Sequence, residues 1–298
     1  MTIADAFTEA NPVWRSLLFV PVNNERHVAT AHTRGADGII LDLEDSIAPE
    51  LKEYARETLP GAANSIASHG SDVLVRVNAE SLDEDIAAAC SRSVRALVIP
   101  KVSAASSIHE SAALLDRLEA GRGLDVGRTR LIAQIEDVNA LPNLDAIAGS
   151  SPRLLGMSLG SEDFSTSVGM QPLPETLYGP NQQVVFACRR AGILPFGFPA
   201  SITLIRDTKA LTVAIKQASD MGMVGAFCIH PNQVSVLNDT LTPAAEEVAD
   251  ATALLQEFEQ AQTGGRAVFA FNGKMVDRPV VMRARDLVAR ARAIAEKS

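Results

Sequence analysis

The sequence predicts an α/β protein, a (β/α)8 TIM barrel with a C-terminal helical lid extension. The chain has 298 residues, which is long enough for one large barrel. Eight short segments rich in Val, Ile and Leu alternate with helix-compatible segments. The apolar segments mostly lack polar alternation, which is typical of parallel strands buried on both faces. The same alternation leaves a doubly wound open sheet as the alternative architecture.

The predicted elements follow one another in a regular order along the barrel. The strands are expected at Ser16–Val20, Gly38–Asp42, Asp72–Val77, Ala96–Pro100, Leu131–Ile135, Leu154–Ser158, Ile193–Phe196 and Ala226–Ile229. The helices between them are expected at Glu25–Arg34, Pro49–Leu59, Leu82–Ser93, Ser106–Ala120, Ala140–Ala148, Asn181–Ala191 and Thr208–Met221. With eight strands placed before residue 230, the barrel is expected to occupy residues 12–235.

The last part of the chain, residues 236–298, is expected to form the final helix and a lid segment. Thr242 followed by Pro243 predicts a helix start, and Gly264-Gly265 predicts the end of that helix near residue 262. An apolar segment at 267–271 then leads to Asn272-Gly273, a dipeptide typical of tight turns. A last helix is predicted over Val280–Lys297.

Composition and charge exclude several classes of protein. The chain carries 27 basic and 36 acidic side chains, a net charge of −9, and only 4% aromatic residues, which argues against a nucleic-acid binder. No apolar segment approaches the roughly 18–20 residues of a membrane span, and the first residues lack the pattern of a signal peptide. Three widely spaced cysteines, Cys90, Cys188 and Cys228, predict free thiols in a reducing compartment. We therefore expect a cytoplasmic protein that acts on a small molecule.

Charged side chains follow several of the predicted strands. They are Asp42, Glu44 and Asp45 after the second strand, Arg76 in the third, Lys101 after the fourth, Glu136 and Asp137 after the fifth, and Glu162 and Asp163 after the sixth. In a barrel of this kind the carboxyl ends of the strands share the rim that carries catalytic residues. So many carboxylates would repel one another without a cation, and ligation by oxygen alone is typical of Mg²⁺. The sequence therefore predicts a Mg²⁺ site, with Arg76 and Lys101 adding positive charge.

Other catalytic patterns are weaker. Gly156–Gly160 fits the GxSxG pattern of a serine hydrolase, with Ser158 as nucleophile and His230 as base, but that pattern needs a helix directly after it. We expect a polar loop at Ser161 and the two acids that follow it, and hence a small strand residue at 158. No HExxH zinc motif is present among the five histidines, and the glycines at 121–127 miss the dinucleotide-binding spacing.

A set of short motifs runs through the chain in a fixed order. They are Arg15–Pro21 (RSLLFVP), Leu41–Ser46 (LDLEDS), Val75–Asn78 (VRVN), Ile99–Lys101 (IPK), Gln134–Glu136 (QIE), Gly160–Phe164 (GSEDF), Cys228–Gln233 (CIHPNQ) and Asn272–Asp277 (NGKMVD). As a set they resemble the citrate lyase beta-subunit-like branch of the HpcH/HpaI aldolase superfamily, which includes malyl-CoA and citramalyl-CoA lyases. The resemblance extends from about Arg15 to Ala295.

The resemblance implies a TIM barrel with a C-terminal lid, assembled as a homotrimer or hexamer. It implies a lyase that cleaves a β-hydroxyacyl-CoA to acetyl- or propionyl-CoA and a 2-oxo acid such as glyoxylate, pyruvate or oxaloacetate. Mg²⁺ would be the cofactor, with Mn²⁺ as the alternative ion. Two other functions stay open: a non-catalytic or partner-dependent subunit of a citrate lyase complex, and an aldolase acting on a hydroxy-oxo acid without CoA.

Matched position by position, the resemblance also implies residue roles. Glu136 and Asp163 would be the metal ligands, with Glu44 and Asp45 as acids nearby, and Arg76 would meet the reacting carbonyl or enolate oxygen. One fixed donor at that oxygen is worth roughly 3–4 kcal/mol of barrier. The remaining candidates are Asp277 as a proton-transfer acid on the lid, Arg15 and Arg26 as contacts to CoA phosphates, and Lys101, Gly160, Ser161 and Glu162 as substrate-binding residues.

The sequence departs from the family pattern at three places. Val22 replaces a glycine after the first strand, and the segment Gly222–Ala226 lacks a lysine. An acidic segment expected after the seventh strand is replaced by Phe196–Pro199. The metal-binding positions are retained, whereas the positions near the thioester differ, so an unusual acyl group or a substrate without CoA is compatible with the sequence.

Overall fold

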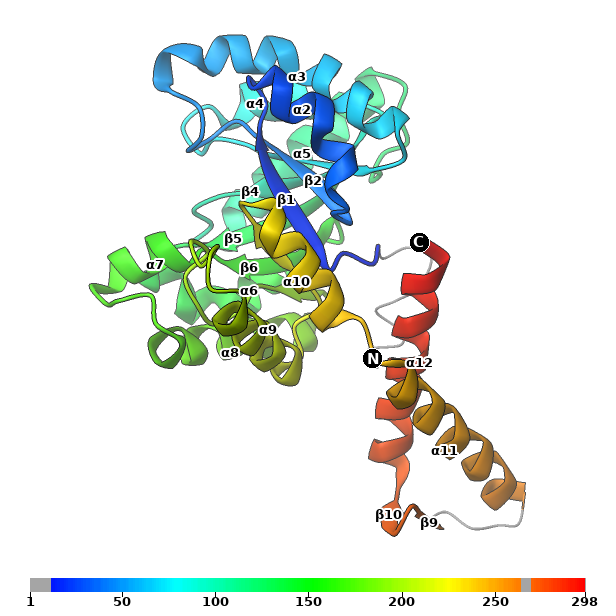
Figure 1. Ribbon diagram of the computed structural model, residues 1–298. Coiled ribbons are helices and arrows are strands. Elements are labelled where there is room, and N and C mark those ends of the chain that lie inside the picture. Colours follow the sequence, from blue (N-terminus) through cyan, green and yellow to red (C-terminus); the bar gives the residue numbers. More distant parts are fainter. Residues whose placement is uncertain (1–11, 264–268, 298) are drawn as a thin grey trace. The chain divides into compact units, whose positions relative to one another are not determined.

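The computed structural model describes residues 12–263 and 269–297 (Figure 1). The chain divides into two compact units. The first, Trp14–Leu241, is the barrel unit, and the second contains the described parts of Thr242–Ser298 and the residues before Trp14. The division lies after Leu241, so that the helix at Pro231–Leu241 belongs to the barrel unit.

Eight parallel strands form the sheet of the barrel unit. They are β1 (Ser16–Pro21), β2 (Gly38–Asp42), β3 (Asp72–Arg76), β4 (Val94–Ile99), β5 (Arg130–Ile135), β6 (Leu154–Leu159), β7 (Leu194–Phe196) and β8 (Ala226–Cys228). Each strand from β1 to β6 pairs with the next in the chain, and β8 pairs with β1. A parallel bridge between Phe196 and Gly225 brings β7 to the start of β8. This order confirms the predicted barrel and excludes the doubly wound sheet.

Gly225 shows why the closure needs a residue without a side chain. A Cβ atom there would lie 1.8 Å from the carbonyl oxygen of Trp14, so no other residue fits without moving the backbone. The backbone of Gly225 also accepts a hydrogen bond of 2.9 Å from the N–H of Gly197. The last and first strands can therefore approach each other closely.

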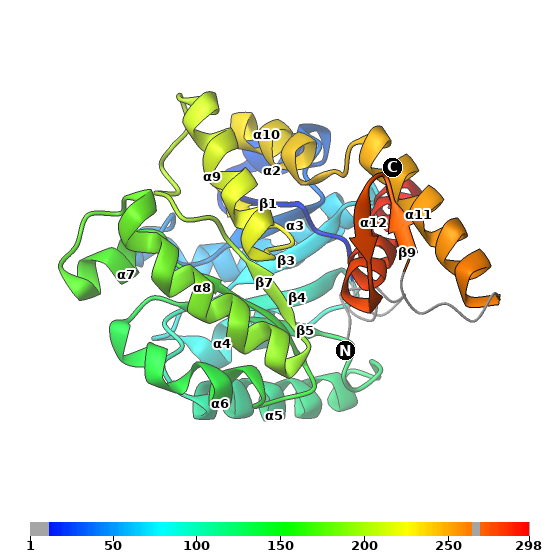
Figure 2. The same cartoon turned by 90° about the horizontal axis from the view of Figure 1, so that it is seen from below.

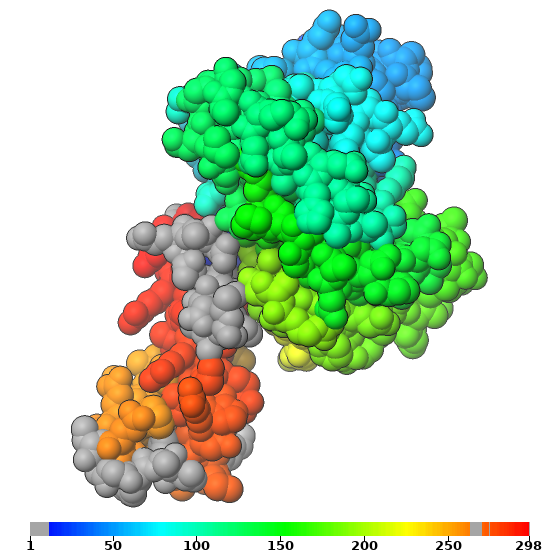
Figure 3. All heavy atoms as spheres, turned by 180° about the vertical axis from the view of Figure 1, so that it is seen from behind, coloured from blue at the N-terminus to red at the C-terminus, as the bar shows by residue number. Residues whose placement is uncertain are grey.

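Helices surround the strands of the barrel unit (Figure 2). They are α2 (Glu25–Thr30), α3 (Lys52–Ser68), α4 (Leu82–Ala89), α5 (Ala105–Gly121), α6 (Leu144–Ala148), α7 (Ser161–Val168), α8 (Pro174–Ala191), α9 (Thr208–Met221) and α10 (Pro231–Leu241), with 3-10 turns at Ala31–Arg34, Pro49–Leu51 and Val138–Asn143. Seen from behind, the segments coloured cyan to green form much of the visible surface of the barrel unit (Figure 3). The strands beneath are buried on both faces, as in β2, where every residue is buried.

Helix α9 illustrates how local sequence sets the bounds of an element. The Asp207 side chain accepts a hydrogen bond of 2.9 Å from the N–H of Ala210, which caps the amino end. Gly222, at φ 101°, ends the helix in the left-handed conformation. Leu211, Ile215 and Ala218 recur at helical spacing and are buried. The observed bounds, Thr208–Met221, agree with the prediction.

Three helices differ most from the sequence-based expectation, and α4 is also shorter than predicted, ending at Ala89 rather than Ser93. The residues from Ser161 to Val168, expected to begin as a polar loop, form helix α7. Helix α3 continues past Pro60 to Ser68, and α8 begins at Pro174 and continues through Pro180. Proline disfavours a helix interior by removing a backbone donor, but packing against the barrel outweighs this local preference in both helices.

The second unit is a helical hairpin with a small antiparallel ribbon. It contains α11 (Ala245–Thr263), β9 (Phe269–Phe271), β10 (Lys274–Val276) and α12 (Arg278–Lys297). Asn272 and Gly273 have φ values of 46° and 72° and form the predicted tight turn between the two strands. The predicted helix end at Gly264-Gly265 and the residues 267–268 lie outside the described residues. Within the described chain, no helix is both long and apolar enough to cross a membrane.

Candidate active site

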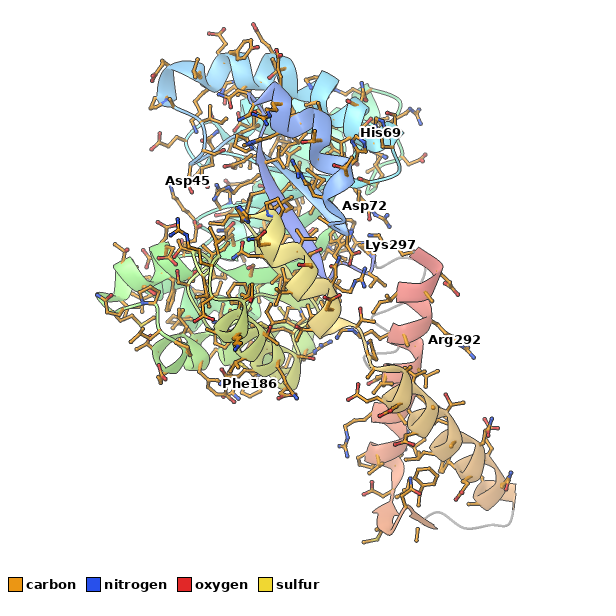
Figure 4. The ribbon with its side chains drawn as sticks, in the orientation of Figure 1. Asp45, His69, Asp72, Phe186, Arg292 and Lys297 are labelled. Atoms are coloured by element: carbon orange, nitrogen blue, oxygen red, sulfur yellow. The ribbon has the colours of Figure 1, made fainter. Side chains whose placement is uncertain are left out.

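A cavity of about 430 Å³ opens at the carboxyl ends of the barrel strands. Its lining includes Asp42 at the end of β2, Arg76 at the end of β3, and Gly160 directly after β6. In Figure 4, Asp45, which also lines the cavity, lies on the opposite side of the barrel unit from Asp72 at the amino end of β3. The cavity therefore lies at the rim where a barrel of this kind carries its catalytic groups.

Arg76 is buried at the centre of the charged residues. Its Nε and Nη2 atoms donate to the two carboxylate oxygens of Asp42, at 2.7 and 2.8 Å. Its Nη1 atom donates to Asp45 at 2.9 Å and lies 3.1 Å from a carboxylate oxygen of Glu44. Burial alone would raise the pKa of Asp42, but the hydrogen bonds and charge of Arg76 outweigh burial and lower it. The guanidinium is therefore charged and held in one orientation.

Glu44 is buried with incomplete compensation of its charge. Its carboxylate lies 3.2 Å from the Lys101 ammonium, yet neither of its oxygens has a hydrogen bond of good geometry. Burial raises the pKa of Glu44, and the charges of Arg76 and Lys101 only partly oppose this. The loop that carries Glu44 is fixed by Lys52, whose ammonium donates to the carbonyl oxygen of Leu43 at 2.7 Å.

Glu136, directly after β5, is buried and held by two donors. The backbone N–H of Lys101 donates to one carboxylate oxygen at 2.8 Å, and the Gln134 amide donates to the other at 2.7 Å. Burial and the negative charges of Glu44 and Asp163 raise the pKa of Glu136 to about 7. A Cβ atom on Gly160 would lie 2.7 Å from the Cγ atom of Glu136, so the glycine leaves the space that this carboxylate occupies.

Asp163 reaches the same rim from the first turn of α7. Because α7 begins two residues after β6 ends, its first turn lies at the mouth of the barrel, and Asp163 is exposed and lines the cavity. Its charge contributes to the raised pKa of Glu136, so the two carboxylates lie within electrostatic range of each other. The structure thus places the two predicted metal ligands at the same rim of the barrel.

The residues present fit a hard divalent cation. Gln134, which lines the cavity, has a buried side-chain oxygen without a hydrogen-bond partner. In the part of the chain that is described, no three His, Cys, Asp or Glu side chains form a ready metal-binding group. An ion held by Glu136 and Asp163 would therefore keep further positions for water and substrate oxygens, which is how Mg²⁺ is commonly bound.

The start of α7 is hydrogen-bonded to the loop after β7. The Ser201 hydroxyl donates to the carboxylate of Glu162 at 2.6 Å, and the N–H of Ile202 donates to the Ser161 hydroxyl at 3.1 Å. Ser161 and Glu162, two of the predicted substrate-binding residues, line the cavity, and both have protein partners. Ser201 has no recognisable sequence motif, so its role in holding α7 becomes visible only in three dimensions.

Six of the predicted site residues are not among those that line the cavity. Glu44 and Glu136 contact the lining residues Arg76 and Gln134, and Lys101 is paired with Glu44.

The other three are Arg15, Arg26 and Asp277. Arg15 precedes β1 and therefore lies at the amino end of the barrel, where Asp37 accepts hydrogen bonds of 2.8 Å from its guanidinium. The structure does not bring Arg15 to the cavity, because a residue before a strand faces the opposite rim. Arg26 is exposed on α2. Asp277, in the second unit, is exposed and accepts a hydrogen bond of 3.3 Å from the N–H of Val280, which caps α12.

Ser158 does not lie on a nucleophile turn. The expectation of a loop after the GxSxG pattern is wrong, since α7 follows it. Ser158 is nevertheless buried within β6 rather than at the strand-to-helix turn that a hydrolase nucleophile requires. The Nδ1 atom of His230, the proposed base, accepts a hydrogen bond of 3.1 Å from the N–H of Asn232.

Comparisons with known proteins agree with this geometry. The sequence profile of the family described as HpcH/HpaI aldolase/citrate lyase matches residues 15–231. The chain is 32% identical over 287 residues to the citrate lyase subunit beta of Leuconostoc mesenteroides subsp. cremoris, which covers 94% of this chain and 93% of the relative. It is 30% identical over 313 residues to an L-malyl-CoA/beta-methylmalyl-CoA lyase of Cereibacter sphaeroides, covering 94% of this chain and 95% of the relative.

A solved structure shares the fold over nearly the whole chain. The protein CitE from Mycobacterium tuberculosis, in complex with magnesium, acetoacetate and coenzyme A, superposes with a TM-score of 0.73 at 25% identity. The match covers 93% of this chain and 97% of CitE. The similarity therefore includes both units of the chain.

Proposed function

Because the chain belongs to the HpcH/HpaI aldolase/citrate lyase family and is a carbon–carbon lyase, we propose that it cleaves a β-hydroxyacyl-CoA to an acyl-CoA and a 2-oxo acid in a Mg²⁺-dependent reaction. The observation that carries the proposal is the pair Glu136 and Asp163 at one rim, with a pKa of about 7 for Glu136 that is raised by burial and by the negative charges of Glu44 and Asp163. The relatives that are lyases of malyl-CoA and the magnesium complex of CitE support the same reaction.

Glu136 and Asp163 would hold the ion, which supplies Lewis-acid polarisation of the oxygen on the 2-oxo acid part of the substrate. The Lys101 N–H and the Gln134 amide keep the Glu136 carboxylate in place. A hydrogen-bonded ligand costs little reorganisation when the ion binds. The two donors to Glu136 therefore belong to the proposed metal site as much as the ligands do.

Arg76 would stabilise the enolate that forms when the carbon–carbon bond breaks. Its ion pair with Asp42 keeps the guanidinium charged and in place. The other edge of the guanidinium faces Asp45, whose side chain is 61% exposed, so a substrate oxygen could replace the Asp45 carboxylate there. A thioester oxygen at this edge would meet a positive charge at the moment when it becomes anionic. Asp277 is the proposed proton-transfer acid, since its carboxylate is exposed at the start of α12.

The experiment is a set of assays on the purified chain. Malyl-, citramalyl- and citryl-CoA are each incubated with Mg²⁺, with Mn²⁺ and with EDTA, and the release of a 2-oxo acid is measured. We expect release with either ion and none with EDTA. Absence of turnover with every thioester, despite metal binding, would contradict the proposal.

A partner-dependent subunit is the second candidate, favoured by the similarity to a citrate lyase subunit beta. Such a subunit would bind Mg²⁺ through the same carboxylates but release nothing when purified alone. The assays above separate the two functions, because only the first predicts turnover of a free CoA ester. A homotrimer or hexamer remains part of the proposal and is measured by light scattering.

A further inference from the structure

The cavity has two chemically different walls. The polar wall comes from β2, β3, β5 and β6 and consists of Asp42, Asp45, Arg76, Gln134, Glu162 and Asp163. The apolar wall comes from β1, β7, β8 and the loops that follow them, and consists of Phe19, Phe198, Ala200, Ile202, Phe227 and Ile229. The proposed reaction uses the polar wall and leaves the apolar wall without a role.

The apolar wall is accessible in part, since Phe198, Ala200 and Phe227 are buried and the other three residues are more exposed. Ile229 is 40% exposed, and Phe19 and Ile202 are half-buried. The rings of Phe19 and Phe227 meet edge to face, with centroids 5.5 Å apart, which gives the wall a defined shape. Apolar surface that stays accessible inside a binding cavity gains free energy when a hydrocarbon group covers it.

The wall is also held in place by buried hydrogen bonds. Gln233, which is fully buried, accepts from the N–H of Ile229 at 2.9 Å and donates to the carbonyl oxygen of Ile202 at 2.8 Å. The N–H of Ile202 in turn donates to Ser161 at the start of α7, two residues before Asp163. The backbone of Ile202 is therefore fixed next to the turn that carries a proposed metal ligand. A group bonded to the metal-bound end of the substrate would lie against this wall.

Positive charge is scarce around the cavity. Among the described residues that line it, Arg76 is the only cation, and it already faces Asp42, Glu44 and Asp45. The ammonium of Lys101 is paired with Glu44. A second carboxylate on the substrate would lose its water at the apolar wall and would find no free cation there.

We propose that the 2-oxo acid released by this enzyme carries an uncharged hydrocarbon side chain, which packs against Ile202, Phe198 and Ile229. A 2-oxo acid with a second carboxylate, such as oxaloacetate, is accordingly a poor product. This inference rests on the proposed function and adds the class of substrate to it. It assigns a specificity role to three residues that carry no chemistry of their own.

The test measures binding of 2-oxo acids to the Mg²⁺-loaded protein by calorimetry. Glyoxylate, pyruvate, 2-oxobutyrate and 4-methyl-2-oxopentanoate form a series of increasing side chain, and oxaloacetate is close in shape to the last of these. We expect affinity to rise by about fourfold for each carbon that reaches the wall. Oxaloacetate is expected to bind at least about tenfold more weakly than 4-methyl-2-oxopentanoate.

Variants at one position locate the effect. Ile202→Ala keeps both backbone hydrogen bonds and should reduce the affinity for 4-methyl-2-oxopentanoate by about tenfold while leaving that for glyoxylate unchanged. Ile202→Lys should reverse the preference in favour of oxaloacetate. Val213→Ala, at a 69% exposed position on α9 outside the cavity lining, is the matched control and should change neither affinity.

The outcomes separate this inference from the proposed function. If oxaloacetate binds as tightly as its hydrocarbon counterpart, or if Ile202→Ala weakens every acid equally, the inference is wrong and the lyase proposal stands. If no 2-oxo acid binds in the presence of Mg²⁺, the lyase proposal fails and the inference fails with it.

Discussion

The two rims of the barrel each bury an arginine among carboxylates, and the two clusters behave in opposite ways. At the amino-end rim, Arg153 before β6 pairs with Asp116 and Glu119 of α5. At the carboxyl-end rim, Arg76 pairs with Asp42, Glu44 and Asp45. The residue types are alike, and only the second cluster lines the cavity.

In the amino-end cluster, both oxygens of the buried Glu119 carboxylate accept hydrogen bonds. Glu119 accepts hydrogen bonds from the N–H groups of Gly127 and Thr129, at 2.7 and 2.8 Å, as well as from Arg153. Burial alone would raise the pKa of Glu119, but these bonds lower it to about 2. The cluster is therefore a structural ion pair whose ionised form the fold stabilises.

At the carboxyl-end rim, carboxylates outnumber the cations that face them. Burial and neighbouring acids raise the pKa of Glu136 to about 7 and raise that of Glu44 as well. The comparison teaches that the presence of buried acids does not identify the functional site. What distinguishes this rim is the raised pKa of Glu136 and Glu44, although Arg76 lowers the pKa of Asp42 beside them. Raised carboxyl pKa values of this kind are common at functional sites.

The largest expected effect is on activity at the carboxyl-end rim. Glu136→Gln removes a proposed metal ligand, so kcat/KM should fall by about a thousandfold or more. The free energy of unfolding should be unchanged or higher, since the variant removes a buried charge that the metal-free fold does not compensate. Steady-state assays and urea titrations measure the two quantities. The control is Asp145→Asn, a change of an exposed carboxylate on α6, and a large stability loss in Glu136→Gln would contradict the comparison.

The next effect is on stability at the amino-end rim. Glu119→Gln leaves Arg153 buried without its main partner, and we expect a loss of about 3–5 kcal/mol in the free energy of unfolding. The kcat/KM of the folded fraction should stay within about twofold of the parent, because Glu119 lies with Arg153 at the amino-end rim and the cavity opens at the carboxyl ends of the strands. Denaturant unfolding followed by circular dichroism checks the first statement. Equal effects on stability and activity would show that the two rims are not separate.

The pH dependence of stability sharpens the same contrast. The folded pKa of Glu119, about 2, lies below its ordinary value of 4.5, so its ionised form stabilises the fold. That contribution, about 3 kcal/mol, is complete above pH 4.5 and is lost as the pH falls toward 2. Urea titrations between pH 3 and 6 should show a shallower slope in Glu119→Gln than in the parent. Identical slopes would contradict the assignment.

A smaller effect is expected in the second unit. Asparagine caps a helix about as well as aspartate, so Asp277→Asn should keep the start of α12 while removing the acid. We expect a fall in kcat of about 10- to 100-fold without a change in thermal stability. Asp277→Ala should in addition lower stability by about 1 kcal/mol. If Asp277→Asn has full activity, the residue is a helix cap and not a proton-transfer group.

Much of the barrel was predictable because it depends on local apolar runs and turn signals. The bounds of β2 and α9 agree with the sequence-based expectation, and the Asn272-Gly273 turn lies where the dipeptide predicts it. The errors occur where packing outweighs propensity. Pro60 and Pro180 suggested breaks within helices that continue. The polar residues at the start of α7 suggested a loop, but they begin a short helix that buries Phe164 and Ser165.

The site was predictable in part, because residues that follow parallel strands share one rim. Glu136 and Asp163 could be placed there from their positions after predicted strands, and Arg76 from its position near the end of one. Arg15 could not function there, since it precedes its strand and lies at the other rim. The partners Gln134 and Ser201 could not be predicted, because neutral side chains acquire a role only through the contacts that the fold creates.

The account depends above all on Glu136 and Asp163 binding one divalent cation, and equilibrium binding of Mn²⁺ followed by electron paramagnetic resonance tests this directly. The parent protein should bind one ion per chain. Binding should weaken at least about a hundredfold in both Glu136→Gln and Asp163→Asn, and it should be unchanged in Glu119→Gln. Binding of equal strength in all four proteins would contradict the account.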